Sequence, residues 1–513
     1  MSLLTERVEC REMLEKLIPV EEAVCFVKDR CKIAISGFTK TGEPKVFLPA
    51  LARHLKQNAP DTRIGLFSGA SLSEDVEGPI SSFVGKRGPY MSSAASRKLI
   101  HSGEMDFSDV HLSHFARNLL YGFYGGIDLA VVEASRILPD GSVVLSGSVG
   151  VSAEALTIAK NIIIEVNPTI PDYSGFHDIA LPSVHPKVGW PIPITNVSDR
   201  VGLPYVEIDK SKVVGIIESD KSDYPVSFKP ATGTDVRIAK NVIEFLQYCH
   251  KTFSWGGRLP PIQSGVGNVA NAIIGELYQS PFKKIRFWTE VFQDGMMKYV
   301  EDDEKFESAS ATALSFSEDA RQDFMRLFTR CRGKVVLRPM WLSNHAELIT
   351  RLFVIAMNTP IEVDIYGHVN STHIDGSRVV NGLGGSGDFF RNAYLSIVHT
   401  PSVRRLRDGR VVSCVMPYVQ HIDHTEHDIN CVVTEQGFAL NTEIRSAKRR
   451  ADDIITKCAH PHFRPVLREY LKIAGDGDQP RLANMDLLRG WWNDYRAACS
   501  EFPDSTMNGD DIS

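Results

Sequence analysis

A strand, a Ser-Gly pair and an amphipathic helix follow one another at two distant places in this chain, and this repeated plan constrains the fold most strongly. The first unit is CKIAISGFTKTGEPKVFLPALARHL and the second is PPIQSGVGNVANAIIGELY, with Ser36-Gly37 and Ser264-Gly265 after their strands. Each predicted helix carries one apolar face, formed by Phe47, Leu48, Leu51 and Leu55 in the first unit and by Val269, Ile273, Ile274 and Leu277 in the second.

A second pair of segments, 130–150 and 363–389, follows in the same order along the chain. Each contains an apolar strand, a turn with Asp-Gly, a β-branched strand and a glycine-rich loop. Strands that alternate with helices favour parallel sheets. We therefore predict an α/β fold of two tandem, similarly built α/β domains with mainly parallel sheets. The alternative is a chance likeness, since strand–Gly–helix units are common.

The predicted domain limits follow from a loss of periodicity in the polar stretch 218–235. We place an N-terminal domain at 1–225 and a C-terminal domain at 226–502, and residues 503–513 form a polar tail. At 513 residues the chain is long enough for each domain to bury its own core.

Composition excludes several classes of partner. The net charge is −6 and no basic block stands out, which argues against nucleic acid. No apolar run approaches the length of a membrane span, and the N-terminal MSLLTERVECREMLEKL is too charged for a secretory signal. Nine cysteines without a CxxC pair indicate a reducing compartment. We expect an intracellular protein of the cytoplasm or mitochondrial matrix, with no membrane partner.

Two glycine-rich loops resemble nucleotide-binding motifs only in part. GFTKTG at 37–42 continues with Glu43-Pro44, where a phosphate-binding loop needs Lys and Ser or Thr. GLGGSG at 382–387 fits G-x-G-x-x-G, but the next predicted strand runs into His399 without the acid that would hold a ribose. The glycines still indicate that the backbone of these loops lies close to another group, because glycine has no side chain that would prevent a close approach.

Three histidines in HIDHTEHD, His421, His424 and His427, have a spacing at which a helix could bind a metal. The segment lies between two predicted strands, so the side chains are expected to spread along a loop. We favour a structural or hydrogen-bonding role and predict no metal site.

Glu290 lies in RFWTEVFQDGM, between a buried strand and what reads as the start of a helix carrying Val291, Phe292 and Met296. A carboxylate there has two interpretations. It is a helix N-terminal acid stabilised by the macrodipole, worth about 0.3–1 kcal/mol, or it is a reactive centre.

Seven motifs decide between these interpretations. SGVGNVANA, TEVFQDGM, Ser-Asn at 343–344, IYGHVNST, NGLGGSGDF, VTEQG and KCAHPHFRP occur in this order. Together they resemble the acetyl-CoA hydrolase/transferase family, the class I coenzyme A (CoA) transferases that include succinyl-CoA:acetate CoA-transferases. The resemblance extends over nearly the whole chain. It implies two tandem α/β domains of similar topology, a homodimer, and no cofactor beyond CoA as a substrate.

The resemblance also implies site residues. The family's covalent nucleophile is a glutamate in a TEVxQDG-like segment, which corresponds to Glu290. Its oxyanion hole lies at backbone N–H groups of two glycine loops, which correspond to Gly265, Val266 and Gly267 and to Gly384 and Gly385. Asn344 matches a residue that holds the nucleophile or the acyl oxygen, and Glu435 matches a second acid near the active site.

The chain departs from the family at two places. Related transferases often carry an arginine near residue 221 that meets the substrate carboxylate, whereas this chain has Lys221. After VTEQG, the segment FALNTEIRSAKRRADDII replaces the usual continuation.

From these motifs we expect a CoA-transferase that acts on short-chain acyl-CoA and a short-chain carboxylic acid, exchanging CoA between acetate and succinate. The alternatives are an acetyl-CoA hydrolase and, from another class, a non-catalytic metabolite-sensing protein of the same fold.

Overall fold

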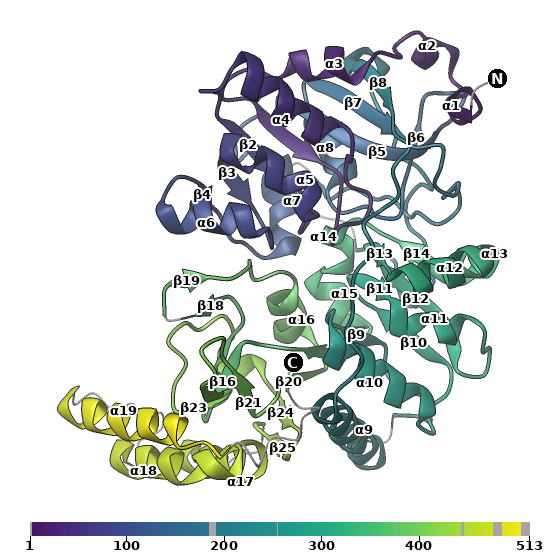
Figure 1. Ribbon diagram of the computed structural model, residues 1–513. Coiled ribbons are helices and arrows are strands. Elements are labelled where there is room, and N and C mark those ends of the chain that lie inside the picture. Colours follow the sequence, from purple (N-terminus) through teal and green to yellow (C-terminus); the bar gives the residue numbers. More distant parts are fainter. Residues whose placement is uncertain are drawn as a thin grey trace.

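Two eight-stranded sheets organise the molecule, whose computed structural model describes residues 3–183, 191–253, 255–374, 376–442, 446–475 and 485–503 (Figure 1). The first sheet contains β1 (Lys32–Ile35), β2 (Ile64–Phe67), β3 (Val84–Gly88), β4 (Asp106–Phe107), β5 (Leu129–Ile137), β6 (Val143–Leu145), β7 (Asn161–Val166) and β8 (Val213–Glu218). The second contains β9 (Ile262–Ser264), β10 (Ile285–Trp288), β12 (Phe306–Ala311), β14 (Val335–Leu337), β15 (Ile355–Asn358), β20 (Leu395–His399), β24 (Cys431–Thr434) and β25 (Gly437–Leu440).

The two sheets share one strand order. The first runs β4-β3-β2-β1-β5-β7-β8 and the second runs β14-β12-β10-β9-β15-β20-β24, with β25 at its edge. All neighbours in these two runs are parallel; only β6, which pairs with β5, and β25 are antiparallel. The predicted fold, two similarly built α/β units with mainly parallel sheets, is confirmed.

Helices cover both faces of the first sheet, so its central strands carry buried side chains on both faces. Alternate residues of β1 and β5 enter two separate apolar clusters, one shared with α4 and the other with α7 and α8. The helices of the first half are α1 (Leu3–Arg7), α2 (Arg11–Leu14), α3 (Val20–Ala23), α4 (Phe47–Asn58), α5 (Glu74–Ile80), α6 (Ala94–Ser102), α7 (Leu112–Leu120) and α8 (Ser152–Ile158).

The second half has more helices, and α17, α18 and α19 gather at its far end from the first half (Figure 1). They are α9 (Gly233–Phe253), α10 (Asn268–Gln279), α11 (Asp294–Val300), α12 (Glu318–Arg326), α13 (Phe328–Lys334), α14 (Met340–Ser343), α15 (Ala346–Arg351), α16 (Ser386–Asn392), α17 (Ala447–Cys458), α18 (Arg464–Ala474) and α19 (Met485–Ser500). Within the described residues no helix combines the length and apolar character that a membrane crossing requires.

Short strands outside the main sheets build the loops between them. They are β11 (Val291–Gln293) with β13 (Ala313–Ser315), β16 (Glu362–Asp364) with β17 (Val369–Asn370) and β23 (Val415–Met416), β18 (His373–Ile374) with β19 (Arg378–Val379), and β21 (Val403–Arg405) with β22 (Val411–Ser413).

The predicted repeat of a strand, a Ser-Gly pair and a helix is confirmed in detail. Ser36-Gly37 follows β1 and Ser264-Gly265 follows β9, and these two strands occupy the same place in their sheets. The eight apolar residues predicted to form the two helix faces are all buried.

The second predicted similarity, between segments 130–150 and 363–389, is wrong, because the two segments are not structurally equivalent. Segment 130–150 contains β5, in the middle of its main sheet, but 363–389 begins in β16, which lies in a separate small sheet. The counterpart of β5 is β15. An apolar strand followed by a turn looks alike in both settings, because the pattern does not reveal which strand will be its neighbour. Asp375, part of the predicted Asp-Gly turn, lies outside the described residues.

The expected joint contains no regular structure between β8 and α9, from 219 to 232. The domain limits 1–225 and 226–502 remain a prediction, and of the tail 503–513 the residues 504–513 lie outside the described part.

The two halves are joined by backbone pairing and a buried ion pair. Leu314 N–H donates to the Gly147 carbonyl at 2.9 Å, and Leu337 N–H donates to the Phe176 carbonyl at 2.9 Å. Arg338 pairs with Asp178, and both side chains are fully buried. The strand ends of one half therefore face loops of the other, which is where a shared cavity forms.

Candidate active site

Glu290 follows the end of β10 and is held by its backbone and its neighbours. Its carbonyl oxygen accepts hydrogen bonds from Thr312 N–H at 2.8 Å and Ala313 N–H at 3.0 Å. On the N-terminal side, Trp288 donates its indole N–H to the Ser343 carbonyl at 2.8 Å. The predicted buried strand is thus confirmed, and it fixes the position of the carboxylate.

The predicted helix after Glu290 begins later than the sequence suggested. Val291–Gln293 form β11, paired with β13, and α11 begins at Asp294. The β-branched and aromatic pair Val291-Phe292 suits a strand better than a helical turn. Glu290 lies four residues before the helix, so the interpretation of it as a helix-terminal acid is wrong.

The Asn344 side chain links the Glu290 carboxylate to that of Asp388. The Asn344 side-chain nitrogen donates to Glu290 Oε1 at 2.9 Å and to Asp388 Oδ2 at 3.2 Å. Both neighbours are acceptors, so it is the amide nitrogen of Asn344 that faces them. Asp388 in turn accepts from the Ser113 N–H at 3.0 Å and from its hydroxyl at 2.6 Å.

The charge state of Glu290 reflects this setting. Burial raises its pKa to about 7; the hydrogen bond from Asn344 opposes the rise and the negative charge of Asp388 adds to it. Within the described part of the chain no lysine or arginine forms an ion pair with Glu290. The ionised, nucleophilic form of this carboxylate therefore increases as the pH rises through about 7.

Gly385 lies directly against this carboxylate. A Cβ added at this position would overlap Glu290 Oε1 and the Asn344 side-chain nitrogen. Gly384 has a left-handed φ of 64°, and Leu383 N–H before it donates to both oxygens of Asp109, at 3.0 and 2.9 Å. The glycine loop is thus anchored to the first half of the molecule.

The second glycine loop lies on the same cavity. The Gly265 N–H donates to the Met357 carbonyl at 2.9 Å, and the Gly265 carbonyl accepts from the Gln293 side chain at 2.7 Å. The Val266 N–H has no hydrogen-bond partner among the described residues, and Gly267 precedes α10 with a φ of 140°. Val266, and not Gly265, has the N–H that a ligand could reach.

A cavity of about 340 Å³ joins these parts. Both halves line it, and the lining residues that matter for the chemistry are Lys40, Val226, Val266, Glu290 and Gly385. A larger cavity, about 800 Å³, lies between α7 and α14–α15, but it contains none of the predicted site residues.

Glu435 is not brought to this cavity. It follows β24, four strand positions from β10, or about 19 Å along the sheet. Its carboxylate accepts from Ser402, through the N–H at 2.8 Å and through the hydroxyl, and from the Gln436 side chain at 2.9 Å. Through these contacts Glu435 holds the loop that contains Ser402, and it lies away from Glu290.

The three histidines of 421–428 spread out as expected. His424 is buried and lies 3.0 Å from the Ser386 hydroxyl, next to the glycine loop, whereas the His421 and His427 side chains are 39% and 77% exposed. Among the described residues no group of three metal-ligating side chains forms. His424 thus has the hydrogen-bonding position that the sequence favoured.

The glycine-rich segment 382–387 does not continue a main-sheet strand, as a dinucleotide loop would. It follows the short hairpin of β18 and β19 and leads into α16. The structure also adds residues that sequence reasoning missed: Ser113, Asp109 and Asp388. The position of Asp388 directly after GLGGSG was the only signal for any of them.

The sequence matches one family along both halves. Residues 1–218 match the acetyl-CoA hydrolase/transferase N-terminal domain, and residues 321–471 match the acetyl-CoA hydrolase/transferase C-terminal domain. A protein named acetyl-CoA hydrolase from Schizosaccharomyces pombe is 43% identical over 507 residues, covering 94% of this chain and 95% of that protein.

Solved structures share the fold at lower sequence identity. RipA from Yersinia pestis superposes with a TM-score of 0.70 at 21% identity, covering 92% of this chain and 99% of that one. A 4-hydroxybutyrate CoA-transferase from Porphyromonas gingivalis gives a TM-score of 0.61 at 18% identity, covering 90% and 98%. The chain therefore belongs to the acetyl-CoA hydrolase/transferase family.

Proposed function

We propose that this protein transfers CoA between a short-chain acyl-CoA and a short-chain carboxylic acid through a thioester on Glu290. The observation that carries the proposal is the setting of Glu290: a cavity carboxylate with a raised pKa, no cationic partner among the described residues and a glycine backbone against it. A structural acid would be expected to have a partner that stabilises its charge.

The first half of the reaction loads CoA onto the enzyme. A Glu290 oxygen attacks the acyl-CoA carbonyl carbon, and the C–S bond breaks to give an acyl–glutamyl anhydride and CoA thiolate. The thiolate then attacks the Glu290 carbonyl carbon, which releases the acyl group as a carboxylate and leaves a glutamyl–CoA thioester. Both enzyme-bound species retain the reactivity of the original thioester.

The second half reverses these steps with the acceptor acid. Its carboxylate attacks the glutamyl thioester and expels the thiolate, which then attacks the acceptor carbonyl and restores free Glu290. Each addition develops negative charge on a carbonyl oxygen. The Val266 N–H and the backbone of Gly384-Gly385 supply donors for that charge, and Asn344 orients the nucleophile.

Acetyl-CoA hydrolysis is the second candidate, favoured by the name of the Schizosaccharomyces pombe relative. In that reaction water replaces the acceptor carboxylate, so the difference depends on the exclusion of water from the cavity. A metabolite-sensing role would have no use for an unpaired carboxylate beside a glycine loop. The homodimer implied by the resemblance remains a prediction.

Product analysis tests the proposal. We expect acetyl-CoA and succinate together to give acetate and succinyl-CoA in equal amounts, many times faster than acetyl-CoA alone gives acetate and free CoA. Chromatography of the CoA species over time measures both. Equal rates of acetate release with and without succinate, and no succinyl-CoA, would contradict CoA transfer and show that the enzyme is a hydrolase.

A further inference from the structure

Lys40 is the cationic side chain of the cavity. Among the described residues that line the cavity it is the only lysine or arginine, and its ammonium group forms no ion pair within the described part of the chain. It does not pair with Glu290, which is held by Asn344 instead. A half-buried lysine without a protein partner leaves its charge available for an anionic ligand.

The backbone around Lys40 is held in a conformation that side chains disfavour. Thr39 and Lys40 have left-handed φ values of 49° and 67°, a conformation that is unfavourable for residues other than glycine. Lys40 N–H donates to the Ser71 carbonyl at 2.9 Å, and the Thr41 carbonyl accepts from the Ser148 hydroxyl at 2.7 Å. These contacts fix the backbone of Lys40 at the edge of the cavity that Lys40 lines.

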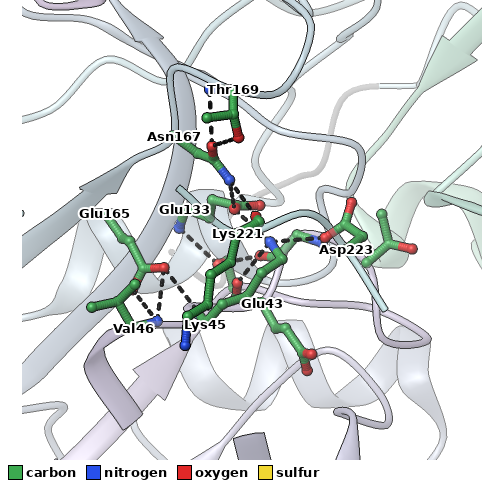
Figure 2. A network of polar contacts seen from close by, with 12 residues as sticks. Glu43, Lys45, Val46, Glu133, Glu165, Asn167, Thr169, Lys221 and Asp223 are labelled. Carbon is green, nitrogen blue, oxygen red and sulfur yellow. Dashed lines mark hydrogen bonds and ion pairs between the residues drawn. The ribbon is translucent and has the colours of Figure 1, made fainter. Parts of the chain in front are cut away.

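A buried polar network fixes the base of the same loop (Figure 2). Lys45 forms ion pairs with Glu133 at 2.5 Å and with Asp223 at 2.8 Å, and Asp223 also accepts from Gly42 N–H at 2.9 Å. Burial alone would lower the pKa of Lys45, but the two carboxylates raise it overall, so it stays charged. Glu165 caps the chain where α4 begins, accepting from the Phe47 N–H at 3.0 Å.

This network also ties the loop to the segment around residue 221, where this chain has Lys221 in place of the arginine that related transferases often carry. Lys221 itself is exposed, and its carbonyl accepts from the Asn167 side chain at 2.7 Å. It does not line the cavity, whereas Val226 from the same segment does. The Val226 N–H donates to the Phe316 carbonyl at 2.9 Å, and the adjacent Ser315 hydroxyl donates to the Thr39 carbonyl at 3.4 Å. Lys40 and Val226 therefore approach the cavity over the same strand end.

We propose that Lys40 binds the second carboxylate of a dicarboxylic acid substrate and so sets the preference of the site for dicarboxylic over monocarboxylic acids. The reacting carboxylate lies at Glu290, and Lys40, which does not pair with Glu290, suits the far end of the same acid. A monocarboxylic acid such as acetate has no group that reaches it. This inference rests on the proposed CoA transfer.

The test compares succinate with acetate as CoA acceptors. Lys40→Met keeps the length of the side chain and removes its charge, Lys40→Arg keeps the charge, and Lys221→Met is the matched control. We expect Lys40→Met to lower the ratio of kcat/KM for succinate to that for acetate about tenfold, through the KM for succinate. Lys40→Arg should retain most of the ratio and Lys221→Met all of it.

Other outcomes distinguish a failure of the Lys40 inference from a failure of the proposed CoA transfer. An unchanged ratio in Lys40→Met, or an equal loss with both acids, overturns the inference, and weaker binding of CoA by calorimetry would assign Lys40 to the CoA phosphates instead. A parent enzyme that transfers CoA to neither acid overturns the proposed function. In that case, inhibition of hydrolysis tests Lys40: succinate should inhibit more strongly than acetate in the parent and not in Lys40→Met, and equal inhibition in the parent contradicts the inference.

Discussion

Glu290→Ala is expected to lower kcat by about 10⁴-fold or more, because it removes the atom that forms the covalent bond with the substrate. Binding of CoA should persist, since the cavity is lined from both halves of the molecule. Steady-state kinetics with acetyl-CoA and succinate measure the loss, and calorimetry with CoA measures the binding.

Glu290→Gln provides the matched control, since it keeps the size of the side chain and removes its charge. We expect it to be inactive at first and to recover slowly if the amide deamidates. Burial raises the pKa of Glu290 from 4.5 to about 7, so the folded parent protein loses stability as the pH rises from about 4.5 to about 7, and the loss is complete at pH 8. Glu290→Gln should therefore unfold at no lower temperature than the parent at pH 8. Activity of the alanine variant within tenfold of the parent would exclude Glu290 as the nucleophile.

Gly385→Ala is expected to give the second largest effect, a fall in kcat and kcat/KM together of about 10²–10³-fold. The added methyl would overlap Glu290 Oε1 and the Asn344 side-chain nitrogen, so the nucleophile has to move. A shift of about 1 Å in a reacting group is enough for such a loss. Steady-state kinetics that separate kcat from KM check it.

Gly126→Ala is the control for the glycine substitution. Gly126 has no atoms within 4 Å of an added Cβ, so its variant should keep parental kinetics. A Gly385→Ala enzyme with unchanged kcat and a raised KM would show that the loop binds substrate without contacting the reacting atoms.

The sequence predicted the fold wherever a local pattern decides the structure. The two strand–Gly–helix units gave β1 with α4 and β9 with α10, because the apolar faces and the glycines are local features. The role of segment 363–389 could not be predicted, because the choice between a main sheet and a small separate sheet depends on strand partners distant in sequence. After Glu290 the start of the helix was also misplaced: Val291 and Phe292 suit a strand, and β11 pairs with β13, which lies more than 20 residues further along the chain.

The candidate site was predicted in part for a related reason. Glu290, Asn344, Val266 and Gly385 lie in motifs, and the structure brings them to one cavity. Contacts between the two halves position Lys40 and Asp388. For Asp388 the only signal in the sequence was its position directly after GLGGSG. Glu435 lies in a motif too, yet the strand order separates it from Glu290 by the width of several strands.

The most direct measurement is the capture of CoA on the enzyme. Incubation with acetyl-CoA, reduction with borohydride and peptide mass mapping should place the modification within residues 286–298, at Glu290, with loss of activity. Burial raises the pKa of the Cys249 and Cys331 thiols to about 12, which makes them poor nucleophiles. A reduced adduct at Glu290 that is absent from Glu290→Ala is the result that we predict. A modification at Cys249 or Cys331, or full activity after borohydride treatment in the presence of acetyl-CoA, would contradict the glutamyl–CoA mechanism.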